Sequence, residues 1–196
     1  PILFAFGAHD QQRALPVLKG PYLGQKLPGT TPEIFAPGIV SKEGDQDRLF
    51  VAPDGSEIVY WEREPVNGRM SIISIRNRGG VWCAPAVLPF SQDYINMEPC
   101  LSPDGKRIFF VSNRPRTGRG EGEKLPDLWM VEKAEGEWSE PKNLGDPVNR
   151  LDIVVQPFYT VDDKLYFCGQ AEDGSSRGIY VSQHAGSGFS EPEKLD

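Results

Sequence analysis

One pentapeptide has the spacing of a serine nucleophile motif. Gly174, Ser176 and Gly178 match G-x-S-x-G, in which the serine attacks a carbonyl from a sharp strand-to-helix turn. Here the flanking pattern predicts a hairpin between two strands and no helix, so we interpret the match as a turn. No nucleophile, base and orienting residue converge elsewhere in the sequence. We therefore predict no catalytic residue.

The sequence also contains few residues that could bind a metal ion. A zinc site needs about four ligands, and the chain has two histidines, His9 and His184. The three cysteines, Cys83, Cys100 and Cys168, lie in apolar stretches without C-x-x-C spacing. We predict no metal and no cofactor. Three buried free thiols are expected, with one disulfide and a spare thiol as the alternative.

Composition excludes several classes of protein. The 21 Lys and Arg residues face 28 Asp and Glu, a net charge of −7, whereas nucleic-acid binders carry a basic surplus. No apolar run approaches the ~18 residues that span a bilayer. Glycine and proline are abundant, with 21 and 18 copies, and both end helices and favour turns. The chain is expected to turn often, to contain little helix, and to bind no nucleic acid.

Two motifs recur in phase along the chain. The first is a turn motif with aspartates about 50 and 58 residues apart, and the second ends in prolines about 56 and 51 apart. The turn copies are Pro53-Asp54-Gly55, Pro103-Asp104-Gly105 and the degraded Val161-Asp162-Asp163. The other copies are Trp82-Cys83-Ala84-Pro85, Trp138-Ser139-Glu140-Pro141 and Phe189-Ser190-Glu191-Pro192. Each aspartate is expected to accept backbone hydrogen bonds in its turn.

Each repeat reads as four short strands. In the second repeat they are expected near 97–101, 106–112, 127–133 and 137–144. The strand after the Asp-Gly turn is apolar on both faces, with Ile108 and Phe110 on one and Phe109 and Val111 on the other. A sheet buried on both faces, in a chain without helices, must stack between copies of itself. This pattern predicts an all-β fold, a β-propeller of four-stranded antiparallel blades.

The repeats resemble those of the TolB-like, WD-like propellers named for their Pro-Asp dipeptide. The resemblance covers about residues 30–196 and is closest in the second unit. It rests on the runs Ser102-Pro103-Asp104-Gly105-Lys106-Arg107-Ile108-Phe109-Phe110, Ser112-Asn113-Arg114-Pro115, Asp127-Leu128-Trp129, Trp138-Ser139-Glu140-Pro141 and Asn143-Leu144-Gly145. It implies a propeller scaffold, a peptide or glycan binder, or an appendage of an enzyme.

The repeats also predict the organisation of the chain. We expect blades at about 45–90, 96–148 and 154–196, with 31–40 as one more outer strand. Residues 1–30 are expected to be a signal remnant or a linker. Rings contain roughly 4–8 blades, and the resemblance implies six. The ring is therefore expected to need further blades, from missing chain or from a second copy.

Propeller ligands are expected on the loops that enter the innermost strands and on those joining the second and third strands. Acidic groups in such a partly desolvated funnel attract cations or basic peptides. The alternative is structural: a turn with an inter-blade salt bridge at residues 113–115, a strand cap at 98, and packing at 61. The candidate ligand-binding residues are Asp47, Trp61, Arg63, Glu98, Asn113, Arg114 and Gln156.

We expect a non-enzymatic binding or scaffold propeller that contacts a peptide, protein or glycan through its loop face. The resemblance implies an exported bacterial protein, periplasmic or extracellular. Two alternatives remain. One is a propeller enzyme acting on carbohydrate, either a lyase or a hydrolase with paired carboxylates. The other is a regulatory propeller of a larger enzyme or envelope protein.

Overall fold

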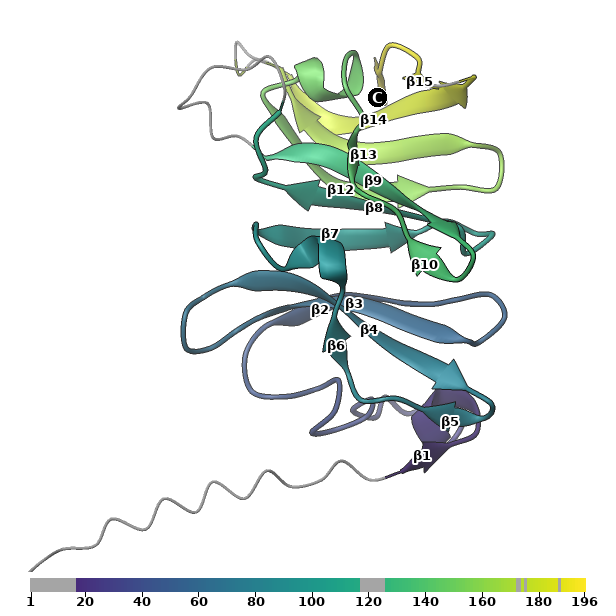
Figure 1. Ribbon diagram of the computed structural model, residues 1–196. Helices are drawn as coiled ribbons and strands as arrows, with labels where there is room; N and C mark the ends of the chain where they lie inside the picture. Colours follow the sequence, from purple (N-terminus) through teal and green to yellow (C-terminus); the bar gives the residue numbers. More distant parts are fainter. Residues whose placement is uncertain (1–16, 117–125, 172–173, 175, 187) are drawn as a thin grey trace, which may run out of the picture.

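Three antiparallel β-sheets follow one another along the chain and stack face to face in the computed structural model (Figure 1). The structure describes residues 17–116, 126–171, 174, 176–186 and 188–196. The helical segments in these ranges are short 3-10 turns. None of them is long and apolar enough to cross a membrane. The fold is all-β, as the sequence predicts, and has the form of a partial β-propeller.

The first sheet is built on four strands in sequence order, of which the outermost is in two pieces, and a short strand from the preceding segment pairs with its edge. The inner three are β2 (Gln46–Val51), β3 (Glu57–Arg63) and β4 (Met70–Arg78). The outer edge consists of β5 (Val81–Trp82) and β6 (Ala86–Val87), which both pair with β4. The proline of the W-x-x-P motif falls between these two pieces. It interrupts the strand because proline has no N–H to donate to the ladder.

The second and third sheets repeat this arrangement. The second sheet comprises β7 (Asn96–Leu101), β8 (Arg107–Ser112), β9 (Asp127–Ala134), β10 (Glu137–Trp138) and β11 (Lys142–Asn143). The third comprises β12 (Ile153–Tyr159), β13 (Lys164–Gln170), β14 (Arg177–Ala185), β15 (Gly188–Phe189) and β16 (Glu193–Lys194). The outer strand expected over 137–144 is thus two segments, with Pro141 between them.

The repeated turn joins the first two strands of each sheet. Its glycine has φ of +69° at Gly55 and +70° at Gly105, a conformation that costs a residue without a Cβ little. Asp163 occupies the same place in the third sheet with φ +57°. The Asp54 carboxylate accepts a hydrogen bond from the backbone N–H of Ser56, at 2.9 Å. The aspartates of the motif therefore shape the turn.

The side chains of each second strand bury both of its faces. Ile108 and Phe110 pack toward the first sheet, whereas Phe109 and Val111 pack toward the third. All four are at most 1% exposed. This is the two-sided burial that the sequence pattern predicts, and it creates one apolar layer between each pair of sheets.

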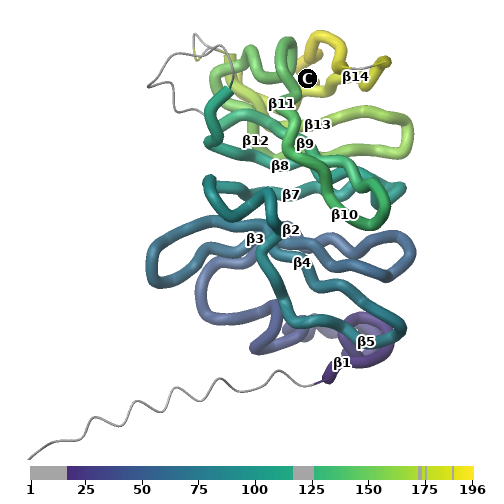
Figure 2. The backbone as a smooth tube through the Cα atoms, in the orientation of Figure 1, coloured from purple at the N-terminus to yellow at the C-terminus, as the bar shows by residue number. Residues whose placement is uncertain are grey.

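The segment before the first sheet covers the face that the second sheet leaves free. It contains β1 (Leu18–Lys19), which pairs with β5, and a 3-10 turn at Pro21–Gly24. Figure 2 shows this purple segment at the end of the stack, remote from the third sheet. Residues 31–40 form no strand here, although Ala36 and Ile39 pack against the first sheet. Their assignment as an outer strand stays a prediction.

Candidate functional site

The innermost strand of every sheet is interrupted by a β-bulge at the same position. The register shifts between Asp47 and Phe50, between Met97 and Cys100, and between Val155 and Phe158. At each bulge one non-glycine residue adopts a left-handed conformation. These residues are Arg48, Glu98 and Gln156, with φ of +56°, +53° and +58°.

Left-handed backbone is uncommon outside glycine and costs about 1–3 kcal/mol at each such residue. Glu98 and Gln156 carry a further constraint because each precedes a proline, Pro99 and Pro157. A following proline disfavours helical backbone at the residue before it. Three equivalent strained positions line the inner edge of the stack. Strain of this kind concentrates at functional sites, so this edge is the candidate site.

Side chains at the bulges satisfy backbone N–H groups. The Asp47 carboxylate accepts a hydrogen bond from the N–H of Arg48, at 2.6 Å. The Glu98 carboxylate accepts one from the N–H of Gln156, at 2.7 Å, and so links the second sheet to the third. The side-chain carbonyl of Gln156 accepts from the Cys168 thiol at 3.1 Å. Three predicted site residues, Asp47, Glu98 and Gln156, therefore share this inner edge.

Cys100 is the residue at which β7 resumes regular pairing after its bulge. Its Sγ accepts a hydrogen bond from the backbone N–H of Tyr159, at 3.2 Å, and its side chain is buried. Burial raises the pKa of the Cys100 thiol to about 11, although the Tyr159 N–H and the charge of Arg48 act in the opposite direction. The thiol is thus protonated at neutral pH, and it serves packing rather than nucleophilic chemistry.

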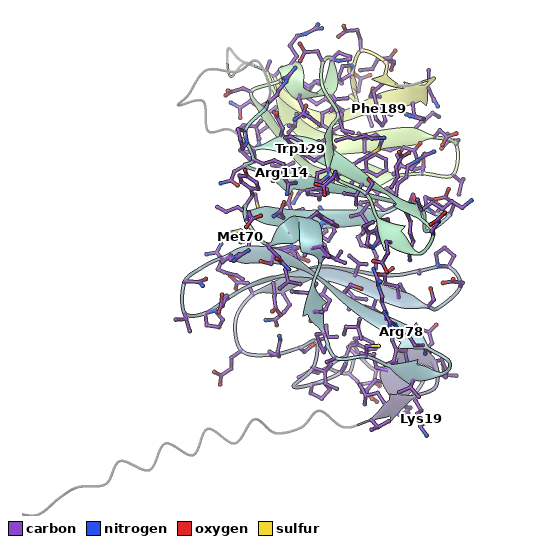
Figure 3. The ribbon with its side chains drawn as sticks, in the orientation of Figure 1. Lys19, Met70, Arg78, Arg114, Trp129 and Phe189 are labelled. Carbon is purple, nitrogen blue, oxygen red and sulfur yellow. The ribbon has the colours of Figure 1, made fainter. Side chains whose placement is uncertain are left out.

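Arg114 is held among aromatic rings between the first and second sheets. Its guanidinium carbon lies 5.0 Å from the ring centre of Tyr94, 5.5 Å from that of Phe110 and 5.3 Å from that of Trp129. Nη2 also donates to the backbone carbonyl of Phe90 at 2.5 Å. Figure 3 shows Arg114 and Trp129 side by side at this level of the stack.

Burial lowers the pKa of the Arg114 guanidinium from its ordinary value. Within the described part of the chain, no carboxylate pairs with it. The alternative predicted an inter-blade salt bridge at residues 113–115, but the described residues provide cation–π contacts and a hydrogen bond to a carbonyl instead. A ligand-binding role for Arg114 stays a prediction.

The other predicted residues lie around the rim of the loop face. Trp61 packs against the apolar layer between the first and second sheets. The Nε atom of Arg63 lies 3.4 Å from the carboxylate of Asp45, and both side chains are exposed. Asn113 accepts a hydrogen bond from the backbone N–H of Ile95, at 2.9 Å, which closes the loop that enters β7. Trp61 lies opposite Asp47 in the ladder of β2 and β3, whereas Arg63 ends β3 and Asn113 follows β8.

Sequence reasoning missed Arg48. The tripeptides Met97-Glu98-Pro99 and Val155-Gln156-Pro157 mark the bulge in two sheets, and the first sheet has Asp47-Arg48-Leu49 in their place. Aligning the three inner strands on the turn motif puts Arg48 at the same position. The missing proline hides the equivalence.

The described residues offer no assembled catalytic or metal site. Ser176 lies in the connection between β13 and β14, where the Tyr180 hydroxyl lies 3.2 Å from its Oγ. This is a hairpin and not a strand-to-helix turn. No three His, Cys, Asp or Glu side chains of the described ranges are placed to hold a metal ion.

A cavity of about 750 Å³ lies elsewhere, between the N-terminal segment and the first sheet. Tyr22, Pro53 and Trp82 contribute apolar walls, and Asp54 and Asn77 contribute polar groups. None of the seven predicted site residues lines this cavity. It is separate from the bulges of the inner strands.

The outer face of the third sheet is apolar and uncovered. Phe158 is 51% exposed and Ile179 is 52% exposed, whereas their equivalents in the second sheet, Cys100 and Leu128, are fully buried. Tyr166 lies beside Phe158 on the same face. The face thus has the composition of the two inter-sheet layers but lacks a covering sheet among the described residues.

Solved structures resemble this stack of sheets. A putative TolB from Agrobacterium tumefaciens aligns with a TM-score of 0.50 and 18% sequence identity over 72% of this chain and 43% of its own. The fold is that of a TolB-like propeller. A puromycin-hydrolysing peptidase from Mycobacterium tuberculosis gives a TM-score of 0.47, 15% identity and coverage of 77% and 23%.

A prolyl endopeptidase gives a TM-score of 0.39, 16% identity and coverage of 71% and 19%. The chain therefore spans less than half the length of each of these three proteins. No protein-family model and no curated sequence matches the chain. The TolB likeness establishes the propeller fold and leaves the function of this chain to its own residues.

Proposed function

We propose that the protein is a non-enzymatic binding or scaffold propeller that contacts a peptide, protein or glycan through its loop face. The observation that carries the proposal is the row of left-handed residues on the inner strands, Arg48, Glu98 and Gln156. Strain repeated at equivalent positions turns polar side chains toward one edge of the stack. That edge adjoins the loops where Arg63 and Asn113 lie.

The proposal includes a larger ring and an exported location. The uncovered face with Phe158 and Ile179 supports completion by further blades, because the equivalent faces of the first two sheets are buried against a neighbour. The resemblance to TolB-like repeats supports a periplasmic or extracellular location. Residues 1–16 of the segment that the sequence predicts to be a signal remnant or a linker lie outside the described residues. Fractionation of the source cells, with an antibody to this chain, tests the location.

Binding is tested with the intact chain on a peptide-display library and a glycan array, followed by affinity measurement for the selected ligands. Glu98→Ala is expected to weaken binding at least tenfold. The inner edge loses a carboxylate, and the N–H of Gln156 loses its hydrogen-bond acceptor. Lys106→Ala changes an exposed side chain in the turn at the opposite end of the strands and serves as the matched control. Equal binding by both variants would contradict the proposal.

An enzyme assay distinguishes the proposed scaffold from the main alternative, a propeller enzyme. The same selected ligands are incubated with wild-type protein and Glu98→Ala, and products are analysed by mass spectrometry. Binding without turnover supports a scaffold. Turnover that disappears in Glu98→Ala would overturn the proposal in favour of a propeller enzyme.

A further inference from the structure

The three bulges differ in how the N–H of the left-handed residue is satisfied. The N–H of Arg48 meets the carboxylate of Asp47 at 2.6 Å, and the N–H of Gln156 meets that of Glu98 at 2.7 Å. The N–H of Glu98 has no side-chain acceptor among the described residues. The middle bulge therefore lacks the carboxylate that the other two have.

The repeat shows which residue would be expected to supply the missing carboxylate. Glu98 of the second sheet reaches the bulge of the third sheet, so the equivalent residue of the first sheet would reach the bulge of the second. That residue is Arg48. A guanidinium offers five N–H donors and no acceptor, so it cannot cap another N–H. Arg48 forms neither an ion pair nor a side-chain hydrogen bond within the described ranges.

The repeat also places Arg48 on the side of the second sheet. Strand β2 packs against β7, and Arg48 holds on β2 the position that Glu98 holds on β7, from which the Glu98 side chain reaches the next sheet. The lowering effect of the Arg48 charge on the pKa of the Cys100 thiol agrees with this placement. Two donors, the Arg48 guanidinium and the Glu98 N–H, thus lie at the same step of the inner edge. Neither donor has a side-chain acceptor among the described residues, so the two together are complementary to an anion.

We infer that the inner edge between the first and second sheets binds a peptide carboxylate, held by the Arg48 guanidinium and the backbone N–H of Glu98. This inference rests on the proposed binding function and names the chemical group that the ligand presents. The planar fork of arginine matches a carboxylate with two parallel hydrogen bonds. A backbone N–H beside it completes a capture site of the kind that proteins use for terminal carboxylates.

Charge favours a carboxylate over a phosphate. The chain has a net charge of −7, and the carboxylates of Asp47 and Glu98 flank the pair. A dianion would meet more repulsion there than a single negative charge does. A peptide is favoured over an acidic sugar because the surroundings are the edges of β2 and β7, whose backbone polar groups match those of an extended chain.

The test uses nuclear magnetic resonance on the full chain, labelled with nitrogen-15. The probes are acetyl-Gly-Gly, its C-terminal amide, and N-acetyl-glutamate amide with a blocked C-terminus. Acetyl-Gly-Gly is expected to shift the Glu98 amide resonance with a Kd of about 1–10 mM, the range of one well-formed ion pair. The uncharged amide is expected to produce no shift. The glutamate probe decides between terminal and side-chain carboxylates, and saturation by either supports the inference.

Three variants test whether Arg48 and the N–H of Glu98 bind the carboxylate. Arg48→Gln is expected to weaken binding of the probe at least tenfold, while Arg78→Gln, at an exposed arginine at the far end of β4, leaves it unchanged. Arg48→Glu restores the repeat pattern, because its carboxylate can accept from the Glu98 N–H as Glu98 does from Gln156. It is expected to abolish probe binding and to move the Glu98 amide resonance without any ligand.

Several outcomes would overturn the inference. They are full binding to Arg48→Gln, an unmoved Glu98 amide in the saturated wild type, or binding of glucuronate in preference to both peptide probes. Loss of binding in Arg48→Gln with no resonance change in folded Arg48→Glu would also contradict the pairing. The proposed function is tested separately, by the affinity for ligands selected from the peptide library and the glycan array. Failure of the carboxylate probes alone therefore leaves loop-face binding intact.

Discussion

The ammonium of Lys133 in the second sheet lies 2.6 Å from the carboxylate of Glu57 in the first sheet. Glu57 is 2% exposed, and its other oxygen accepts from the Ser74 hydroxyl and lies 3.3 Å from Nε of Arg76. The Lys133 ammonium also lies 5.0 Å from the ring centre of Trp138. A buried carboxylate with two cations thus joins the first two sheets.

The substitution Glu57→Gln is expected to lower the free energy of unfolding by about 3 kcal/mol, since it leaves two partly buried cations without their counter-charge. Urea titration followed by tryptophan fluorescence measures the change. Glu137→Gln is the matched control, because Glu137 pairs with the same Arg76 at 3.1 Å but is 71% exposed. Its cost is expected to be below about 1 kcal/mol. Equal costs for the two variants would contradict a buried ion cluster.

The same carboxylate makes stability depend on pH. Burial alone would raise the pKa of Glu57, but the contacts with Lys133, Ser74 and Arg76 outweigh it and hold the pKa below 4.5. A depressed folded-state pKa adds stability that is complete above about pH 4.5 and is lost as pH falls through the folded value.

The stability difference between wild type and Glu57→Gln is therefore expected to shrink as pH falls from 6 toward 3. Urea midpoints measured across that range give the difference directly. Asp54, Asp104 and Asp162 also have lowered pKa values, but they are present in both proteins and cancel in the comparison. A difference that is constant with pH would show that Glu57 does not titrate in this window.

The repeat architecture was predictable because local chemistry produces it. Asp-Gly turns and W-x-x-P interruptions recur in the sequence, and each requires the same backbone wherever it occurs. The Asp-Asp turn of the third sheet is one residue shorter, because the N–H of Thr160 bonds the carbonyl of Lys164, and Asp163 takes the left-handed position. Strands that are apolar on both faces can bury both faces only when the sheets stack on one another.

The site was only partly predictable. Asp47, Glu98 and Gln156 were found through their place at the start of inner strands, but the left-handed backbone that orients them is imposed by register with the neighbouring strand. Arg48 was missed because it has leucine, not proline, after it. The aromatic surroundings of Arg114 bring together segments that no local pattern connects.

Arg114 is expected to stabilise the junction of the first and second sheets. Arg114→Lys should lower the free energy of unfolding by about 1–2 kcal/mol, because an ammonium loses the planar stacking on three rings and the geometry of the hydrogen bond to Phe90. Arg63→Lys, at an exposed arginine on the same rim, is the control and should cost less than about 0.5 kcal/mol. Thermal unfolding of both variants measures the effect, and a neutral Arg114→Lys would contradict the stacking.

The uncovered face of the third sheet predicts losses of stability of different size for two phenylalanines on adjacent strands. Phe167, on the buried face, is 1% exposed and stacks on Tyr180 with ring centres 5.9 Å apart. Phe167→Ala should lower the free energy of unfolding by about 3–5 kcal/mol, the cost of a large cavity. Phe158→Ala, on the face that is open here, should cost less than about 1 kcal/mol.

Phe158→Ala should also reduce concentration-dependent self-association, because contiguous exposed apolar area promotes contact between molecules. Sedimentation velocity of wild type and both variants at several concentrations measures this, and urea midpoints give the stabilities. If Phe158→Ala instead costs as much as Phe167→Ala, another sheet already covers the face in solution. The face is then an interior layer of a larger ring, and its apolar composition reflects blade packing and not a free surface.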